Sequence, residues 1–497
     1  MWNSNLAKMI LPLGLLIAGC GGGGGGGGSA PDTAPSGANP PPAVEVPADS
    51  APPTTTDPGS DDGLEAISFK SGPCAATYSG SFALVEGQDA SKPLSGFAKP
   101  AKGKPYNDPV YGSCIVRATD ADAEGLSGFA RNDYARRQPF NADDSRFIVY
   151  SRGQSWYLYD TQTLKLIKKL DLNGAGVEPQ WHPTHPDVMY VIPNGGGMTI
   201  TEYNVATGEK NVVTDFTRVQ KIAGHDATSI KQIWPSAAKV STKTEGSPSM
   251  DARWWGLVVL DSNNKGLGMI SYDMLKDEIA GVYDFAKDGG GVPAPDHISI
   301  SATGEYVVPS WSSPACSGGS LGTRSKPCGM MSFSRDFNFA IGLAPKSPHS
   351  DLGLDADGRD VVIAGDYDSG WVRMWDLANG QSTNLWQIYT GGNSTAMHLS
   401  ARNFYKPGWV LISTYKEKVA GSGWYANKVM AVELKPNPRI LNLAHTYNKG
   451  GDYFSEPHAA VNRDFTKVLF NSNWNSGNDD NVDTYMIELP ADTVPAL

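Results

Sequence analysis

Four of the eight histidines in this 497-residue chain recur at long and similar intervals. His297, His349, His398 and His458 follow one another at spacings of about 52, 49 and 60 residues. Neutral imidazoles that converge suit a divalent metal, or a site in which one ring acts as a base and another binds a carboxylate. These spacings are too long for a local metal motif, so only a repeated fold would bring the rings together.

Two further segments, 129–138 and 452–458, carry residues that suit an acidic substrate. They contribute Tyr134, Arg136, Arg137, Tyr453, Glu456 and His458. Two adjacent arginines can grip a carboxylate or sulfate with paired N–H donors. An ion pair with the nearby Asp133 is the alternative role for these arginines.

The elements that would position these residues repeat seven times. A short strand, a turn containing Asp or Gly and a strongly apolar strand recur about every 53 residues, and a further apolar strand follows each copy. The copies are 137–150, 178–192, 246–260, 296–310, 349–364, 397–414 and 457–473. Each repeat has room for four short strands, as one β-propeller blade does. The sequence therefore predicts an all-β, seven-bladed β-propeller rather than an array of β-sandwiches.

The two ends of the chain are expected to share the last blade. Only a proline-containing tail follows 485–489, whereas 111–119 has the pattern of the missing outer strand. Pairing of these N- and C-terminal strands would close the ring and make the first and last blades neighbours. The starts of the inner strands would then gather at one face. We expect His398, the tyrosines, the arginines and Glu456 to form one patch there, with Glu178 at an equivalent position.

The cysteines and the N-terminus indicate an exported protein. A short apolar run ends at Ile17-Ala-Gly-Cys20, which resembles a bacterial lipobox; the resemblance implies a signal peptide and a lipid on Cys20. Residues 21–62 are rich in Gly and Pro and predict a flexible linker, which leaves 63–497 for the propeller. We expect an anchor in the outer membrane, with the protein facing the periplasm or the cell surface.

Four other cysteines remain, an even number in an oxidising compartment. Cys316 and Cys328 flank a Gly/Ser-rich loop and are expected to pair, which leaves Cys74 to pair with Cys114. Free buried thiols are the alternative.

Composition and missing motifs narrow the function classes. A formal charge of −11 argues against a nucleic-acid binder. The sequence lacks a phosphate loop, a G-x-S-x-G elbow and an HExxH helix. Trp474 and the polar loop 479–483 could bind substrate or Ca²⁺, unless that loop is simply solvated. Two roles are open for three aromatic residues, stacking on sugar rings or packing in the core: Trp311, Trp424 and Tyr425.

Over about residues 64–497 the chain resembles the propeller polysaccharide lyases, namely the ulvan lyases and, more distantly, the oligogalacturonate lyases. The residues that carry the resemblance are Arg136-Arg-Gln138, Glu178-Pro-Gln180, Asp296-His297, His349-Ser-Asp351, Met397-His398 and Glu456-Pro-His458. The resemblance implies that the protein cleaves a uronic-acid-containing polysaccharide by β-elimination. Its partner would be this anionic polysaccharide, and we expect the enzyme to be a monomer.

We assign roles within such a reaction as follows. His458 or His398 would be the base and Tyr134 or Tyr453 the acid. The substrate carboxylate would be neutralised by Arg136 and Arg137, or by a divalent metal (Ca²⁺, Mn²⁺ or Zn²⁺). The metal ligands would be His297, His349 and His398; Glu178, Glu456 and Trp474 would help to bind the sugar. The alternatives are a propeller lipoprotein that binds glycan or protein without catalysis, and a metal-dependent hydrolase.

Overall fold

The computed structural model describes residues 72–78, 82–418, 423–450 and 453–497. The chain divides into units 1–63 and 64–497, and all of the described residues belong to the second. Cys20, the signal peptide and the linker 21–62 therefore lie outside the described residues. No helix in the described part of the chain is long and apolar enough to cross a membrane.

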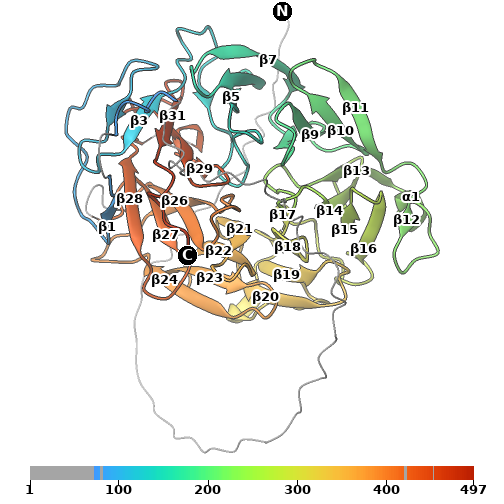
Figure 1. Cartoon of the computed structure of the whole chain (residues 1–497). Helices are drawn as coiled ribbons and strands as arrows, with labels where there is room; N and C mark the ends of the chain where they lie inside the picture. The colour runs from blue at the N-terminus through green and yellow to red at the C-terminus, as the bar shows by residue number, and fades with distance from the viewer. Residues whose placement is uncertain (1–71, 79–81, 419–422, 451–452) are drawn as a thin grey trace, which may run out of the picture. The chain divides into compact units, whose positions relative to one another are not determined.

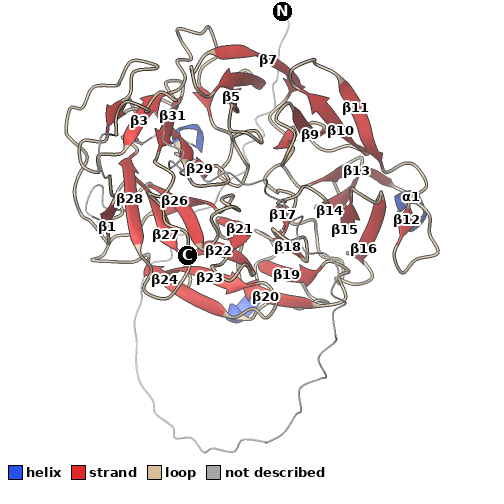
Figure 2. Ribbon diagram, in the orientation of Figure 1, coloured by secondary structure: helices blue, strands red, loops and turns tan. Residues whose placement is uncertain are grey.

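The described chain is all-β, as predicted, and is built from sheets of short antiparallel strands (Figures 1 and 2). Five of the sheets contain β1 and β8 to β28. The first contains β8 (Glu178–Trp181), β9 (Val188–Ile192), β10 (Thr199–Asn204) and β11 (Lys210–Asp215), and the second contains β12 (Lys221–Ile222), β13 (Ala237–Ser241), β14 (Trp254–Asp261), β15 (Gly266–Asp273) and β16 (Glu278–Asp284). The other three contain β17 (His297–Ile300), β18 (Tyr306–Ser310), β19 (Met330–Ser334) and β20 (Ala340–Ala344); β21 (Ser350–Leu354), β22 (Asp360–Asp366), β23 (Trp371–Asp376) and β24 (Ser382–Gln387); and β25 (Ala396–Ser400), β26 (Trp409–Tyr415), β27 (Lys428–Glu433) and β28 (Ile440–His445), with β1 (Val85–Glu86) at the edge of the last. The short helices are α1 (Ile230–Ile233) and the 3₁₀ segments Ser317–Gly319 and Tyr453–Ser455.

The remaining strands belong to one nine-stranded sheet, which joins strands from 106–173 to strands from 460–488. They are β2 (Tyr106–Asn107), β3 (Cys114–Arg117), β4 (Ala130–Arg131), β5 (Arg146–Ser151), β6 (Ser155–Asp160), β7 (Leu166–Asn173), β29 (Ala460–Val461), β30 (Lys467–Ser472) and β31 (Asp483–Glu488). β3 pairs antiparallel with β31 in a register that sets Cys114 opposite Glu488, and Figure 1 shows the two strands side by side. A single parallel pair, Asp483 with Ala130, joins β31 to β4.

Apolar side chains fill the spaces between consecutive sheets. Most strands are buried on both faces, so β14 and β26 read as continuous apolar runs rather than as alternating patterns. One core cluster, for example, joins Trp409 and Leu411 of β26 to Phe470 of β30 and Tyr485 of β31. The face-to-face packing of whole sheets holds the starts of the inner strands in fixed positions.

Both predicted disulfides are confirmed. Cys316 pairs with Cys328 and Cys74 pairs with Cys114, the first residue of β3. The backbone N–H of Cys74 also donates to the Glu488 carboxylate at 2.9 Å. The start of the described chain is thus fastened to its last strand.

Two inner strands begin earlier than the predicted residues 137 and 246. β4 pairs with Tyr150 and Ser151, the chain then leaves the sheet, and it returns where Phe140 bridges to Phe147. Likewise, β13 pairs with β14, and 242–245 leaves the sheet with Lys243 and Thr244 at positive φ. We call 132–139 the crossing loop and 242–245 the second loop.

Gly246 ends the second loop where there is no room for a side chain. A Cβ at this position would overlap the carbonyl oxygen of Ile298 in β17 and lie 2.7 Å from Cβ of Thr242. We therefore expect Gly246→Ala to lower the free energy of unfolding by about 1–3 kcal/mol, because a backbone atom has to move. Chemical denaturation of both proteins tests this, and equal stability would contradict the packing described.

Candidate functional site

The crossing loop contacts residues beside several other strands and carries predicted site residues with it. Its Asn132 donates to the carbonyl of His458 at 2.8 Å, and its Tyr134 ring lies 4.9 Å from the His458 ring and 5.6 Å from that of His398. Gln138, at the other end, points to the carbonyl of Arg402. The structure therefore brings together Tyr134, His398 and His458, as the sequence predicts.

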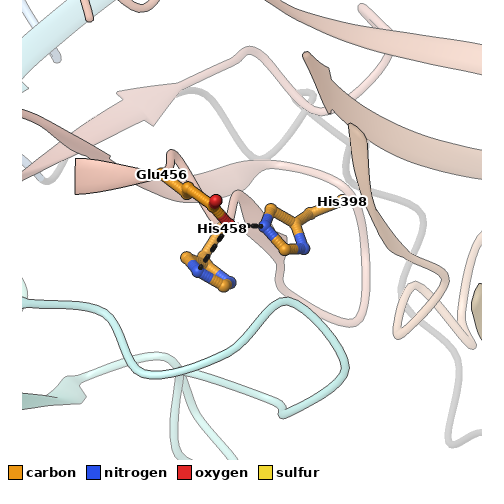
Figure 3. A group of neighbouring side chains, drawn as sticks. All are labelled: His398, Glu456 and His458. Atoms are coloured by element: carbon orange, nitrogen blue, oxygen red, sulfur yellow. Dashed lines mark hydrogen bonds and ion pairs between the residues drawn. The ribbon is translucent and has the colours of Figure 1, made fainter. Parts of the chain in front are cut away.

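The centre of the site is a buried group of two histidines and a carboxylate (Figure 3). His398 Nε2 lies 2.9 Å from Glu456 Oε2, and His458 Nε2 lies 3.8 Å from the same oxygen. The two imidazole rings stack with 3.8 Å between centroids. His398 comes from β25, whereas Glu456 and His458 precede β29, so this group spans two sheets.

Burial and hydrogen bonding set the charges of this group. Burial lowers the pKa of His398 to about 3, despite its hydrogen bond to Glu456. For Glu456, burial opposes ionisation, but the hydrogen bonds from His398 and Lys416 outweigh it and lower the pKa to about 2. Glu456 is thus an anion that can only accept, so neutral His398 donates to it through Nε2–H.

His458 has the features of a reactive group rather than a structural one. Its side chain is fully buried, yet neither ring nitrogen has a hydrogen-bond partner among the described residues. Burial lowers its pKa well below the usual range, so the ring is neutral. Its φ is +39°, a conformation that non-glycine residues seldom adopt and that is often found at functional sites. Tyr453, 46% exposed, flanks the ring at 5.0 Å.

His349 lies at the edge of the group. Its ring is 4.7 Å from that of His398, and its Nδ1 lies 2.9 Å from the carbonyl oxygen of Met397. A carbonyl can only accept, so Nδ1 carries a proton and donates it to Met397. His349 is absent from the described set that could share a metal, so its predicted role as a ligand stays a prediction.

A cleft of about 270 Å³ opens beside the group. Glu456 and Tyr415 belong both to its lining and to the surroundings of His398. Lys416, half-exposed, donates to Glu456 Oε1 at 2.9 Å, and Lys449 lines the cleft as well. The lining thus carries two lysines and two glutamates, Glu417 and Glu456, so its formal charges balance.

The two predicted substrate-binding arginines are buried and already paired. Arg136 forms an ion pair with Glu245 at 2.7 Å and donates to the carbonyl of Ser350. Arg137 pairs with Asp133, the alternative weighed from the sequence, and donates to the carbonyl of Thr244 at 2.7 Å. In this structure they hold the crossing loop to the second loop.

Three other predicted residues lie outside the group. His297 is next to Glu245 and Asp296, at 3.9 and 3.8 Å, and is absent from the set that could share a metal. Glu178 is fully buried and accepts from Ser241, Thr242 and the N–H of Thr244, which fixes the second loop. Trp474 packs in the core, stacked on Tyr447 and Tyr485.

The aromatic residues considered for sugar stacking are also in the interior. Trp311, Trp424 and Tyr425 are buried, and the Trp311 indole donates to the carbonyl of Pro293. Conversely, no sequence pattern indicates Lys416, Tyr415 or Glu245 as site residues. Lys416 directly follows an apolar strand, and its positive φ, which turns it toward Glu456, is visible only in three dimensions.

No protein-family model and no curated sequence matches the chain. Solved structures do match it. An oligogalacturonate lyase in complex with manganese aligns with 13% identity and a TM-score of 0.52, over 83% of this chain and 100% of that chain. An oligogalacturonate lyase from Vibrio parahaemolyticus aligns with 10% identity and a TM-score of 0.51, over 78% and 96%.

The chain has a propeller fold like theirs. At these identities the likeness concerns the fold alone. The side chains of this lyase-like propeller show whether it could bind a divalent metal. His398, Glu456 and His458 each offer a ligand atom, all within 4.8 Å of one another, and both nitrogens of His458 lack partners in the described chain. Two neutral imidazoles and a carboxylate are good ligands for Mn²⁺ or Zn²⁺, so the residues fit.

The low pKa of His398 makes stability fall in acid. An unfolded histidine takes up a proton below about pH 6.5, whereas folded His398 stays neutral down to about pH 3. Between these values each unit of acidification should remove about 1.4 kcal/mol through this group alone. We expect His398→Asn to have a shallower loss of melting temperature between pH 6.5 and 4.5 than the wild type. Parallel slopes would contradict a buried neutral His398.

Proposed function

We propose that this chain is a polysaccharide lyase that cleaves a uronic-acid-containing, ulvan-like polysaccharide by β-elimination. The observation that carries the proposal is His458, a neutral, buried imidazole whose ring nitrogens make no hydrogen bond in the described chain, next to the anionic Glu456, which lines the cleft. The likeness to oligogalacturonate lyases agrees with it at the level of fold.

The architecture that we propose divides the nine-stranded sheet at the single β31–β4 pair. The strand groups are then the seven blades of a propeller, and β3 completes the last blade and closes the ring. From the sequence we also propose a monomer, anchored through Cys20 in the outer membrane.

In the proposed reaction His458 takes the C5 proton, which lies α to the substrate carboxylate. The C5–H electron pair becomes the C4=C5 double bond, the C4–O4 bond breaks, and O4 takes up a proton. Tyr453 or Tyr134 supplies that proton; burial raises the pKa of Tyr134, which keeps it protonated until O4 departs. Lys449 would neutralise the carboxylate, helped by Lys416, which already pairs with Glu456.

A divalent metal, when bound by His398, Glu456 and His458, would supply additional positive charge to the substrate carboxylate. His458 would then be a ligand rather than the base. The two versions of the site differ in their sensitivity to a chelator.

The test is to incubate the purified protein with ulvan, polygalacturonate and other uronic-acid polysaccharides and to follow the ultraviolet absorbance of the unsaturated product, with and without a chelator. A rise on one substrate supports the lyase and identifies its sugar. No rise on any substrate, from folded protein, contradicts it and favours a glycan-binding propeller. Products without a double bond favour a hydrolase.

A further inference from the structure

A small cavity lies near the ends of β25 and β29, at the ends that are farther from His398 and His458. Arg402 comes directly after β25, which contains His398, and Arg463 comes after β29, which follows His458. Both arginines line the cavity, together with Gln138, Gln180, Ser249 and Phe404. Its volume is about 30 Å³, more than the roughly 10–15 Å³ that one water needs. A small ion fits this volume, whereas a sugar ring does not.

The positive charge of Arg463 is buried without a counter-ion. The residue is 7% exposed, and within the described ranges it forms no ion pair. Its side chain makes one hydrogen bond, from Nη1 to the carbonyl of Asn141 at 3.2 Å. A buried guanidinium ordinarily pairs with a carboxylate, because an uncompensated buried charge costs several kcal/mol. Burial lowers the pKa of Arg463 and the charge of Arg402 acts in the same direction, whereas Tyr405 and the more distant carboxylate of Asp144 partly oppose the shift.

Arg402 adds a further donor but no net charge. Its Nη2 and Nε bond to Asp351, which neutralises it, and its Nη1 makes no hydrogen bond in the described chain. The cavity therefore offers free N–H groups from two guanidinium ions and one uncompensated positive charge. This donor set is complementary to a single negative charge.

We propose that this cavity is a binding site for a small monovalent anion, chloride or a carboxylate group, held by Arg463 and Arg402. The anion would supply the missing counter-ion of Arg463. It would also fasten the segment after β29 to Asn141 and Gln138, and so to the first strands of the domain. The proposal is independent of the lyase reaction.

The test compares melting temperatures in sodium chloride, sodium formate and sodium methanesulfonate at equal ionic strength, since methanesulfonate is too large for the cavity. A ligand that binds only the folded protein raises its melting temperature, and we expect a rise of about 2 °C at saturating anion. We expect the rise in chloride, in formate or in both for the wild type, and none for Arg463→Met. Arg218→Met, which removes an arginine with a 77% exposed side chain, is the matched control and should keep the rise.

Chlorine NMR provides a second measurement on the unmodified protein. Excess broadening of the chloride line that formate displaces, and that Arg463→Met abolishes, would identify the site even if that variant melts early. Equal melting temperatures of the wild type in all three salts, without excess broadening, would overturn the proposal. Broadening that persists in Arg463→Met would also overturn it, as adventitious binding elsewhere.

Discussion

His458→Asn is expected to lower the rate of uronate elimination about 100-fold to 10,000-fold, the usual contribution of a general base. The ring nitrogens of His458 make no hydrogen bond in the described chain, so its loss removes a base or a metal ligand rather than a structural hydrogen bond. Asparagine tolerates the positive φ at this position, which keeps the backbone in place. The initial rate of double-bond formation measures the effect.

The matched control is His185→Asn, because His185 is exposed in the turn after β8, away from the cleft. It should keep full activity. The His458→Asn variant should stay folded, with a melting temperature lowered by the loss of a buried ring that stacks on His398. An active His458→Asn, or an inactive variant that is also unfolded, would count against the assigned role.

Removal of the Cys74–Cys114 disulfide should lower the free energy of unfolding more than removal of the Cys316–Cys328 disulfide. The bond closes a loop of 40 residues, and the chain-entropy relation gives about 4 kcal/mol for a loop of this length. The Cys316–Cys328 bond closes only 12 residues and should contribute about 3 kcal/mol. Denaturation midpoints of the two double-serine variants measure the difference.

The difference between these variants should exceed the loop-length estimate. Without its disulfide, the segment around Cys74 is free to leave β31, and the hydrogen bonds from Cys74 and Tyr78 to Glu488 are lost with it. Two variants of equal stability would show that the N-terminal segment stays bound without the covalent link.

Much of the site could be predicted because a repeated fold turns long sequence intervals into short distances. His398 and His458 occupy equivalent places in their repeats, so equivalent strand starts bring them to one face. Glu456 and Tyr453 follow because they are close to His458 in sequence. The disulfides needed only a count of cysteines and one obvious loop.

The rest of the site could not be predicted, because it depends on contacts between residues that are far apart in the sequence. The crossing loop and the second loop leave their sheets because Arg136, Arg137 and Glu178 bind partners far away in sequence. Such residues have the same types as substrate-binding residues, and only their partners distinguish the two roles. Trp474 is similar: its polar neighbours predict a loop, whereas its ring completes an aromatic stack in the core.

The pairing of β3 with β31 has a consequence for biosynthesis. Cys74 and Glu488 are 414 residues apart, so β3 is synthesised long before β31. Until β31 is synthesised, β3 has an open edge, the kind of edge that recruits strands from other chains. A nascent or truncated chain should therefore be the aggregation-prone species, and loss of as little as β31 should deprive the first strands of their partner.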